Sequence, residues 1–374
     1  MKNQQPENKK LKVIVSGGGT GGHIFPAVAI ANAIKNKYPE TEFLFVGAKG
    51  KMEMEKVPKA GYPIEGLWIS GLQRKLTLGN LLFPIKVIAS LIKSMRIIKK
   101  FKPDIAIGVG GYAGGPLLKA ATMLNVPALI HESNSFPGIT NKLLGKSVNT
   151  VCVAFMGMEK YFPKQKIVIT GNPVRQEIVK LAGKRERAVA HFDLDPDRPI
   201  VLVIGGSLGA RSINQAIDQA LPLFKEKNYQ VLWQTGVHYK EQSKKALKEL
   251  VYDGVKAHEF IYEMDLAYAA ADVVVSRAGA MSVSELALVA KPAILVPYPY
   301  ASEDHQTKNA MTLVLKEAAV LVKDSETKEK LYNEIDDLLE HPEKMEKLVV
   351  NINALALGDA DQLILQEVEK LVNK

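Results

Sequence analysis

A glycine-rich turn near the start of this 374-residue chain is the first place where residue types and spacing indicate chemistry. An apolar run ends in Ser16-Gly17-Gly18-Gly19-Thr20-Gly21-Gly22-His23, and a helix is expected over residues 26–37. Glycines permit a tight turn and close backbone approach, and a helix start presents unpaired N–H groups and a positive dipole end. We therefore expect an anion at this turn, either a phosphate or a developing negative charge.

The same turn fits two nucleotide-binding motifs incompletely. Three of its glycines match the G-x-G-x-x-G pattern of nicotinamide and flavin enzymes, but the next expected strand ends in Val46-Gly47-Ala48, without the acid that would bind a ribose. As a Walker A motif it has His23 in place of lysine and Ile24 in place of Ser or Thr. Both assignments are therefore disfavoured.

Two similar turns stand in the second half of the chain. Gly205-Gly206-Ser207-Leu208-Gly209-Ala210 follows an apolar run and precedes a helix expected over residues 212–225. Arg277-Ala278-Gly279-Ala280-Met281-Ser282 follows another run, and the next helix carries Glu285 near its start. Glu285 either caps that helix or accepts hydrogen bonds from ribose hydroxyls. A phosphate at the first turn and a ribose at the second would place a nucleotide on this half.

The elements that must position these turns are short apolar runs bounded by Gly or Pro, which are typical of buried parallel strands. These runs are 13–16, 43–46, 105–109, 128–130, 150–153, 167–170, 200–204, 230–234, 273–276, 293–296 and 319–322. Helical stretches between them indicate an α/β fold with doubly wound parallel sheets. The alternation restarts near Ile200, so we predict two Rossmann-like domains facing a cleft, with ligands at the carboxyl ends of the strands.

Composition narrows the class of protein. Hydrophobic residues make up 47% and charged residues 24%, which excludes a disordered, collagenous or coiled-coil chain. The 49 basic and 40 acidic residues leave a net charge of +9, which suggests an anionic partner. The single cysteine, Cys152, excludes an internal disulfide and a cysteine-based metal cluster. We expect no signal peptide and no transmembrane helix, so that any membrane contact is peripheral.

Together, these strings resemble the MurG family, the GT-B glycosyltransferases of peptidoglycan synthesis that add N-acetylglucosamine to lipid I to form lipid II. The resemblance covers nearly the whole chain. Its ordered matches are residues 17–23, Gly110-Gly111-Tyr112, His131-Glu132-Ser133-Asn134, Gly171-Asn172-Pro173-Val174-Arg175, residues 205–210, residues 276–285, and Asp304-His305-Gln306 with Asn309-Ala310. The chain departs from the pattern at Ser133, where the family usually has Gln, and at His305, where some members have Gln.

The resemblance implies a domain of residues 1–172 that faces acceptor and membrane, a UDP-sugar-binding domain of residues 173–358, and a C-terminal helix in residues 359–374 that crosses back. It implies inverting transfer from UDP-N-acetylglucosamine to the C4 hydroxyl of the muramoyl sugar of lipid I, at the cytoplasmic face of the cell membrane. Whether proteins of cell-wall synthesis or cell division bind this chain stays an open question. The implied donor contacts are Thr20, Gly21, Gly22, Asn134, Arg175, Ser207, Ile261, Ala280, Met281, Ser282, Val283, Ser284, Glu285, His305 and Gln306.

Such a transfer needs a base for the proton of the acceptor hydroxyl. His23 is the first candidate because it lies on the turn and titrates near neutrality, and Glu132 is the second. For each, a purely positioning role stays open. Asp193-Leu194-Asp195 matches the Asp-x-Asp of metal-dependent glycosyltransferases, but it lies in a connection before a strand and indicates a solvated turn. We expect no metal and no cofactor, because backbone N–H groups and helix dipoles can stabilise the leaving UDP.

A basic segment marks the candidate membrane face. Residues 74–102 contain eight Lys or Arg and no acid, and Ile85, Ile88, Ile92, Met95 and Ile98 recur at helical spacing. Either this helix packs on its sheet with a solvated basic face, or a patch that includes Leu82, Phe83 and Lys86 docks on an anionic membrane. The resemblance favours the membrane patch.

Four alternatives from other classes stay open. They are a lipid glycosyltransferase with another acceptor such as diacylglycerol, a UDP-sugar epimerase on the same double-Rossmann fold, a nucleotide-sugar-binding module without catalysis, and a nucleic-acid-binding protein. No nucleic acid is expected as a partner, because the basic residues are spread and poorly interleaved with aromatics.

Overall fold

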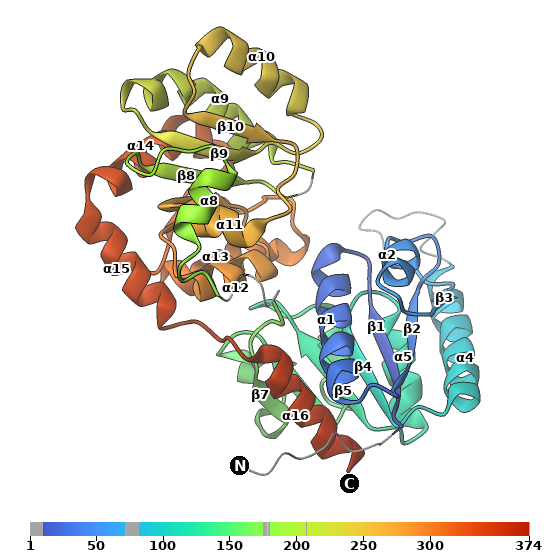
Figure 1. The fold of residues 1–374 in the computed structure, drawn as a ribbon. Coiled ribbons are helices and arrows are strands. Elements are labelled where there is room, and N and C mark those ends of the chain that lie inside the picture. The colour runs from blue at the N-terminus through green and yellow to red at the C-terminus, as the bar shows by residue number, and fades with distance from the viewer. Residues whose placement is uncertain (1–9, 72–81, 175–177, 179, 207, 374) are drawn as a thin grey trace. The chain divides into compact units, whose positions relative to one another are not determined.

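The computed structural model describes residues 10–71, 82–174, 178, 180–206 and 208–373 (Figure 1). The chain divides into two compact units. Unit 1 comprises Met1–Val174 together with Asp359–Lys374, and unit 2 comprises Arg175–Gly358. The last residues of the chain therefore fold with its first half.

Unit 1 is built on a parallel sheet whose described strands follow the order β3-β2-β1-β4-β5-β6-β7. The strands are β1 (Lys12–Gly17), β2 (Glu42–Ala48), β3 (Ile64–Leu67), β4 (Ile105–Gly110), β5 (Ala128–Glu132), β6 (Thr150–Val153) and β7 (Ile167–Ile169). The helices are α1 (Gly21–Lys37), α2 (Glu53–Lys59), α4 (Phe83–Phe101), α5 (Gly114–Met123), α6 (Ile139–Leu144) and α16 (Ala360–Val372), with short 3₁₀ turns η1 (Met158–Lys160) and η2 (Lys164–Lys166).

Successive side chains along these strands point to opposite faces of the sheet and pack into two separate hydrophobic cores. Val13 and Ile105 point to the face covered by α1 and α16, whereas Ile14 and Ala106 point to the face covered by α4 and α5 (Figure 1). Burial on both faces explains why the strands read as continuous apolar runs rather than as alternating ones.

Helix α16 completes the first of these cores. Its residues Ile364, Leu365 and Val368 are buried among the side chains of the central strands. The Tyr38 hydroxyl, at the end of α1, donates a 2.6 Å hydrogen bond to Glu369, which also pairs with Lys37 at 2.5 Å. The C-terminal residues thus stabilise the unit that carries the first glycine-rich turn.

Unit 2 repeats the architecture with the described strand order β10-β9-β8-β11-β12-β13, all parallel. The strands are β8 (Ile200–Ile204), β9 (Gln230–Gln234), β10 (Val255–His258), β11 (Val273–Ser276), β12 (Ala293–Leu295) and β13 (Val320–Leu321). The helices are α8 (Arg185–His191), α9 (Arg211–Glu226), α10 (Lys240–Leu250), α11 (Met264–Ala270), α12 (Ala280–Val289), α13 (His305–Val314), α14 (Thr327–Glu340) and α15 (Pro342–Asn353), with 3₁₀ turns η3 (Ser302–Asp304) and η4 (Asp324–Glu326). Trp233 is fully buried in the core that α9 and α14 cover.

The structure confirms the predicted fold class of two doubly wound parallel sheets. Every predicted strand is present within one or two residues of its expected bounds. Two strands were not predicted, β3 and β10, and helix α1 begins at Gly21 rather than at Pro26. The earlier helix start brings His23 into the first turn of α1.

One helix ends in a backbone conformation that its residue does not favour. Val251, the residue after α10, has φ of 48° and is 79% exposed. A β-branched residue in the left-handed region is strained, and glycine is preferred there. We predict that Val251→Gly raises the free energy of unfolding by about 1 kcal/mol.

Denaturant unfolding of purified protein checks this prediction. The matched control is Val350→Gly at an exposed position inside α15, where the same substitution should lower the free energy of unfolding. If both variants were destabilised to the same extent, the strain assigned to Val251 would be wrong.

Candidate functional site

Three loops of unit 1 meet at one edge of its sheet. Strands β1, β4 and β5 are neighbours and run parallel, so the loops that follow them share the carboxyl edge. The loop after β1 is the glycine-rich turn, and Thr20 at its end has the extended backbone of an N-cap residue. The Thr20 carbonyl accepts hydrogen bonds from the N–H groups of His23 and Ile24, at 3.1 and 3.2 Å, which begins helix α1.

The loop after β4 lies directly on the glycine-rich turn. Gly110 and Gly111 have φ of 115° and 91°, a region that glycine adopts without penalty. A Cβ at Gly110 would lie 2.6 Å from the His23 ring, and one at Gly111 would lie 2.5 Å from the Gly18 carbonyl oxygen. The His23 ring and the Gly18 backbone therefore occupy the space that side chains at positions 110 and 111 would need.

The contacts of His23 define which of its ring nitrogens carries the proton. Nδ1 lies 3.0 Å from the Gly18 carbonyl oxygen and 3.3 Å from the Thr20 hydroxyl. A carbonyl oxygen only accepts hydrogen bonds, so Nδ1 is the donor and Nε2 is the basic nitrogen. The half-buried ring thus has the tautomer that a general base needs.

Glu132, the second candidate base, has both carboxylate oxygens engaged by its own loop. Oε1 accepts from the backbone and side-chain nitrogens of Asn134 at 3.0 and 3.2 Å. Oε2 accepts from Gly138 N at 3.1 Å and from Asn141 Nδ2 at 2.8 Å. Both carboxylate oxygens therefore already hold two hydrogen bonds each from the loop that Glu132 shapes. This geometry favours the positioning role for Glu132 and places Asn134 at the edge of the sheet.

His131, one residue earlier on β5, is buried beneath this loop. Its Nε2 lies 3.0 Å from the Gly171 carbonyl oxygen, and the neighbouring Ser133 is also buried, with its carbonyl bound by Asn172 Nδ2 at 3.0 Å. Burial lowers the pKa of His131 from 6.5 to about 4. Ser133, where the family usually has Gln, therefore packs inside unit 1.

The anion expected at the glycine-rich turn is in part a side chain of the protein itself. Gly19 N donates a 2.8 Å hydrogen bond to Glu53 Oε2, and Glu53 is 1% exposed. Glu53 was not predicted from the sequence, because it lies 34 residues beyond its partner Gly19.

The glycine-rich turn of unit 2 is also held by backbone packing. A Cβ at Gly209 would lie 2.1 Å from the Thr235 carbonyl oxygen, so the turn after β8 lies against the loop after β9. Ser207, in the middle of this turn, and Arg175 lie outside the described residues.

Gln234, at the end of β9, bridges this turn to the loop that follows β10. Its Nε2 donates to the Gly206 carbonyl at 3.1 Å, and its Oε1 accepts from Ile261 N at 3.0 Å. The sequence analysis missed Gln234. Of the two backbone groups of Ile261, the N–H is therefore already engaged within the protein.

The turn after β11 leads into α12, which carries most of the implied nucleotide contacts. The helix begins at Ala280 after the N-cap Gly279, so that residues 280–283 form its first turn. Glu285 follows, and its Oε2 accepts a 3.2 Å hydrogen bond from the buried Tyr268 hydroxyl of α11. Tyr268 holds the carboxylate of Glu285, and it too was missed from sequence.

Helix α13 presents His305 and Gln306 in its first turn, at the same edge of the sheet. Gln306 Oε1 accepts a 2.9 Å hydrogen bond from Tyr298 N, in the loop after β12. Glu303 and Asp304, which precede the helix, both have positive φ, 53° and 54°. Two consecutive non-glycine residues in this region are costly and persist only where the surroundings enforce them.

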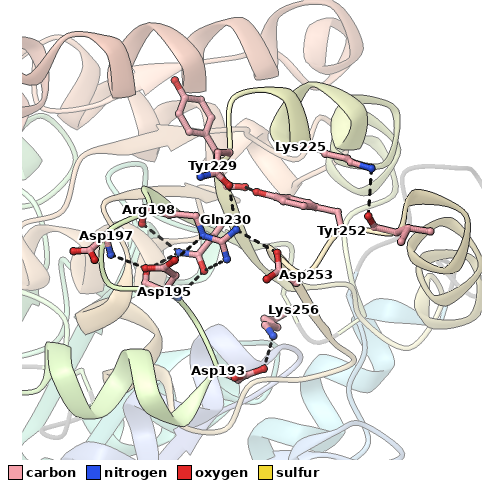
Figure 2. A network of polar contacts seen from close by, with 12 residues as sticks. Asp193, Asp195, Asp197, Arg198, Lys225, Tyr229, Gln230, Tyr252, Asp253 and Lys256 are labelled. Carbon is pink, nitrogen blue, oxygen red and sulfur yellow. Dashed lines mark hydrogen bonds and ion pairs between the residues drawn. The ribbon is translucent and has the colours of Figure 1, made fainter.

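The Asp193-Leu194-Asp195 string lies at the amino ends of β8, β9 and β10, away from the edge described above (Figure 2). Asp193 pairs with Lys256 at 2.6 Å, and Asp195 pairs with Arg198 at 3.3 Å. Gln230, buried at the start of β9, accepts from Asp195 N at 2.7 Å. These carboxylates stabilise the entry into the sheet of unit 2.

Helix α4 carries an exposed apolar ridge. We define the α4 patch as Leu82, Ile85, Ile88 and Ile92, which are 45–58% exposed. Phe83 and Met95, by contrast, pack against the core, and Ile98 is buried in it.

Lys86 lies 5.6 Å from the ring of the exposed Trp68 and donates to the Ser70 hydroxyl at 3.2 Å. Residues 74–81 of the basic segment lie outside the described residues, and no helix in the described part of the chain is long and apolar enough to cross a membrane.

Comparison with known proteins places this geometry among glycosyltransferases. The glycosyltransferase family 28 N-terminal domain matches residues 13–153, and the C-terminal domain of the same family matches residues 200–362. The chain is 54% identical over 368 residues to the UDP-N-acetylglucosamine--N-acetylmuramyl-(pentapeptide) pyrophosphoryl-undecaprenol N-acetylglucosamine transferase of Cytophaga hutchinsonii, with 98% of this chain and 99% of that protein aligned. The protein of the same name from Flavobacterium psychrophilum is 50% identical, over 97% of this chain and 98% of its own length. The crystal structure of Acinetobacter baumannii MurG is similar with a TM-score of 0.78 at 27% identity, over 97% of this chain and 100% of that one.

Burial of neutral His131 predicts a pH dependence of stability. Between pH 6.5 and about 4 the unfolded chain binds a proton at His131 that the folded chain does not, so stability falls as pH falls through this window. The loss from this residue between pH 7 and pH 5 is about 2 kcal/mol.

Denaturant unfolding of the wild-type protein and of His131→Gln at the two pH values measures this contribution. Glutamine has an amide that can donate to Gly171 but has no titrating group, so the variant should lose about 2 kcal/mol less than the wild-type protein. His258, whose pKa burial also lowers, is present in both proteins and cancels in the comparison. Equal losses in the two proteins would contradict the prediction.

Proposed function

Because the chain belongs to glycosyltransferase family 28, we propose that it transfers N-acetylglucosamine from UDP-N-acetylglucosamine to lipid I, which yields lipid II for peptidoglycan synthesis. The observation that carries this proposal is the identity of about half of all residues to transferases of this activity over nearly the full length of both chains. This identity also favours lipid I over diacylglycerol as the acceptor.

Unit 2 binds the donor in this proposal. The N-terminal turn of α12, residues Ala280–Val283 with Ser284, lies at the nucleotide, where its N–H groups and dipole stabilise negative charge. Glu285, held by Tyr268, accepts hydrogen bonds from the ribose hydroxyls. The Ile261 carbonyl faces uracil, because its N–H is bound to Gln234. His305 and Gln306 contact the sugar, as does Asn134 from unit 1.

Unit 1 binds the acceptor and supplies the base. The C4 hydroxyl oxygen of the muramoyl sugar bonds to the anomeric carbon of the donor from the face opposite UDP, while the bond from that carbon to the UDP oxygen breaks. The hydroxyl proton passes to His23 Nε2, and the bonding electron pair leaves with UDP. Thr20, Gly21 and Gly22 form the turn that presents His23, and backbone N–H groups stabilise the leaving diphosphate.

UDP release from UDP-N-acetylglucosamine, with and without a lipid I analogue, tests the reaction. We expect release only with the acceptor. His23→Ala should lower turnover about 10²–10⁴-fold, because a positioned base contributes that much. His341→Ala, at an exposed histidine between α14 and α15 of unit 2, is the matched control and should leave turnover unchanged.

Two results would count against this assignment. UDP release or sugar isomerisation that is independent of acceptor indicates an epimerase, and acceptor-dependent turnover that survives His23→Ala places the base elsewhere.

We further propose that unit 1 docks on an anionic membrane through the α4 patch. The patch leaves four large apolar side chains in contact with water, beside Lys86 and the other basic residues of α4. A lipid-linked acceptor requires an enzyme that works at the bilayer surface, and apolar side chains together with lysines bind such a surface. The protein then acts as a peripheral membrane protein at the cytoplasmic face.

Co-sedimentation with vesicles that contain anionic lipid checks the docking proposal. Ile88→Asp combined with Lys86→Glu should reduce binding more than about 10-fold, because the substitutions remove an apolar contact and reverse a charge. Val350→Asp with Lys347→Glu makes the same changes on the exposed face of α15 and should leave binding unchanged. Equal binding of the two double variants would contradict the proposal.

A further inference from the structure

The buried carboxylate of Glu53 is linked to the candidate base His23 through one peptide group of the glycine-rich turn. Glu53 is the first residue of α2 and is 1% exposed. Its Oε2 accepts a 2.8 Å hydrogen bond from Gly19 N, and its Oε1 accepts a 3.0 Å hydrogen bond from Ala48 N, at the end of β2. Both oxygens are thus held by backbone N–H groups, and the carboxylate joins the glycine-rich turn to the neighbouring strand.

The Glu53 side chain lies against two glycines, Gly18 and Gly47, where a Cβ atom would overlap it. A Cβ at Gly18 would lie 2.4 Å from Glu53 Cδ, and one at Gly47 would lie 2.5 Å from Glu53 Cγ. Glycine at both positions is therefore required for the side chain to reach the turn. Such a fit on two sides distinguishes Glu53 from an acid that merely caps a short helix.

The peptide group between Gly18 and Gly19 links this carboxylate to His23. Its N–H, from Gly19, donates to Glu53, and its carbonyl, from Gly18, accepts from His23 Nδ1 at 3.0 Å. Hydrogen bonds in such a row polarise one another, because a carboxylate that pulls on the N–H makes the carbonyl oxygen more negative. A more negative carbonyl binds the Nδ1 proton more strongly.

We propose that Glu53 is a positioning residue for His23 and acts through the Gly18–Gly19 peptide. It holds His23 in the Nδ1–H tautomer and stabilises the imidazolium that forms when Nε2 takes the proton of the acceptor hydroxyl. The arrangement corresponds to the Asp–His pair of serine hydrolases with one peptide group inserted. No proton moves along the row, and the transferred proton stays on His23 Nε2. The proposal rests on the proposed role of His23 as the base.

Other titratable groups near His23 bear on the test. His131 of β5 interacts electrostatically with His23, but burial keeps it neutral above pH 5, since its pKa is about 4. Tyr112, in the loop after β4, has its ring 4.0 Å from the position a Cβ would take at Gly19. Neither residue is an acidic side chain of the Asp or Glu type, so Glu53 is the carboxylate whose removal the histidine should sense.

NMR of protein carrying ¹⁵N-labelled histidine reads the tautomer of His23 directly, with His23→Gln to assign its signals. In the wild-type protein we expect the Nδ1–H form. Glu53→Gln keeps the volume and removes the charge, and we expect a mixed tautomer and imidazole protonation at lower pH. The downward displacement should be smaller than the roughly 1–3 pH units that a carboxylate in direct contact produces. Glu55→Gln, two residues along α2 on an exposed acid paired with Lys59, is the matched control and should change neither property.

Turnover supplies an independent readout. Glu53→Gln should lower kcat roughly 10- to 100-fold, less than the roughly 10⁴-fold loss for a carboxylate bonded directly to the histidine. The KM for UDP-N-acetylglucosamine should change less than twofold, whereas general disruption of unit 1 would affect both. The acidic limb of the pH–rate profile should move to lower pH.

Each outcome decides a separate point. An Nε2–H tautomer in the wild-type protein overturns the proposal without any variant, so this test does not depend on the folding of Glu53→Gln. His23 signals that respond identically in Glu53→Gln and Glu55→Gln also overturn it. Full turnover of His23→Ala, together with the expected NMR changes, removes the base assignment while the link from Glu53 to His23 stands.

Discussion

Contact of bare backbone against bare backbone, at the carboxyl edge of each sheet, is the constraint on which both candidate sites depend. In unit 1 the loop after β4 lies on the loop after β1, where a Cβ at Gly111 would approach Gly18 O to 2.5 Å. In unit 2 the loop after β9 lies on the loop after β8, where a Cβ at Gly236 would approach Gly209 N to 2.1 Å. Any side chain would force these loops apart, so the positions of His23 and of the Gly206 turn follow from glycine packing.

The central strands of both sheets could be predicted because they are buried on both faces and read as unbroken apolar runs. The two strands that escaped prediction, β3 and β10, each lie at one edge of their sheet, whereas β7 and β13 at the opposite edges were predicted from their apolar runs. Each is only four residues long and includes a charged side chain, Glu65 in β3 and Lys256 in β10. An edge position tolerates a charged side chain, which interrupts the apolar run, so only pairing with β2 or β9 defines these two strands.

Some residues of the candidate sites could be predicted from the sequence, and others could not. The positions of the glycine-rich turns, His23 and Glu285 could be predicted, because each follows an apolar run and so lies at the carboxyl edge of its own sheet. Glu53, Gln234 and Tyr268 could not, because their partners lie 34, 27 and 17 residues away. A single Glu, Gln or Tyr carries no local motif, and its role depends on tertiary structure. Gly47 inside β2 was the one available signal, since a glycine in a strand indicates close approach of another group.

The two glycine-rich turns are hydrogen-bonded by side chains of different charge, Glu53 in unit 1 and Gln234 in unit 2. In unit 1 the turn N–H meets the carboxylate of Glu53, and the carbonyl of the same peptide group meets His23. Negative charge there suits the base role proposed for His23, because an imidazole becomes positive when it accepts a proton. In unit 2 the turn meets the neutral amide of Gln234, which binds the Gly206 carbonyl. A carboxylate there would repel a diphosphate, whereas an amide orients the turn without adding charge. In the proposed reaction, the residue that hydrogen-bonds each turn thus has the charge that suits the group bound there: a carboxylate near the imidazolium and a neutral amide near the diphosphate.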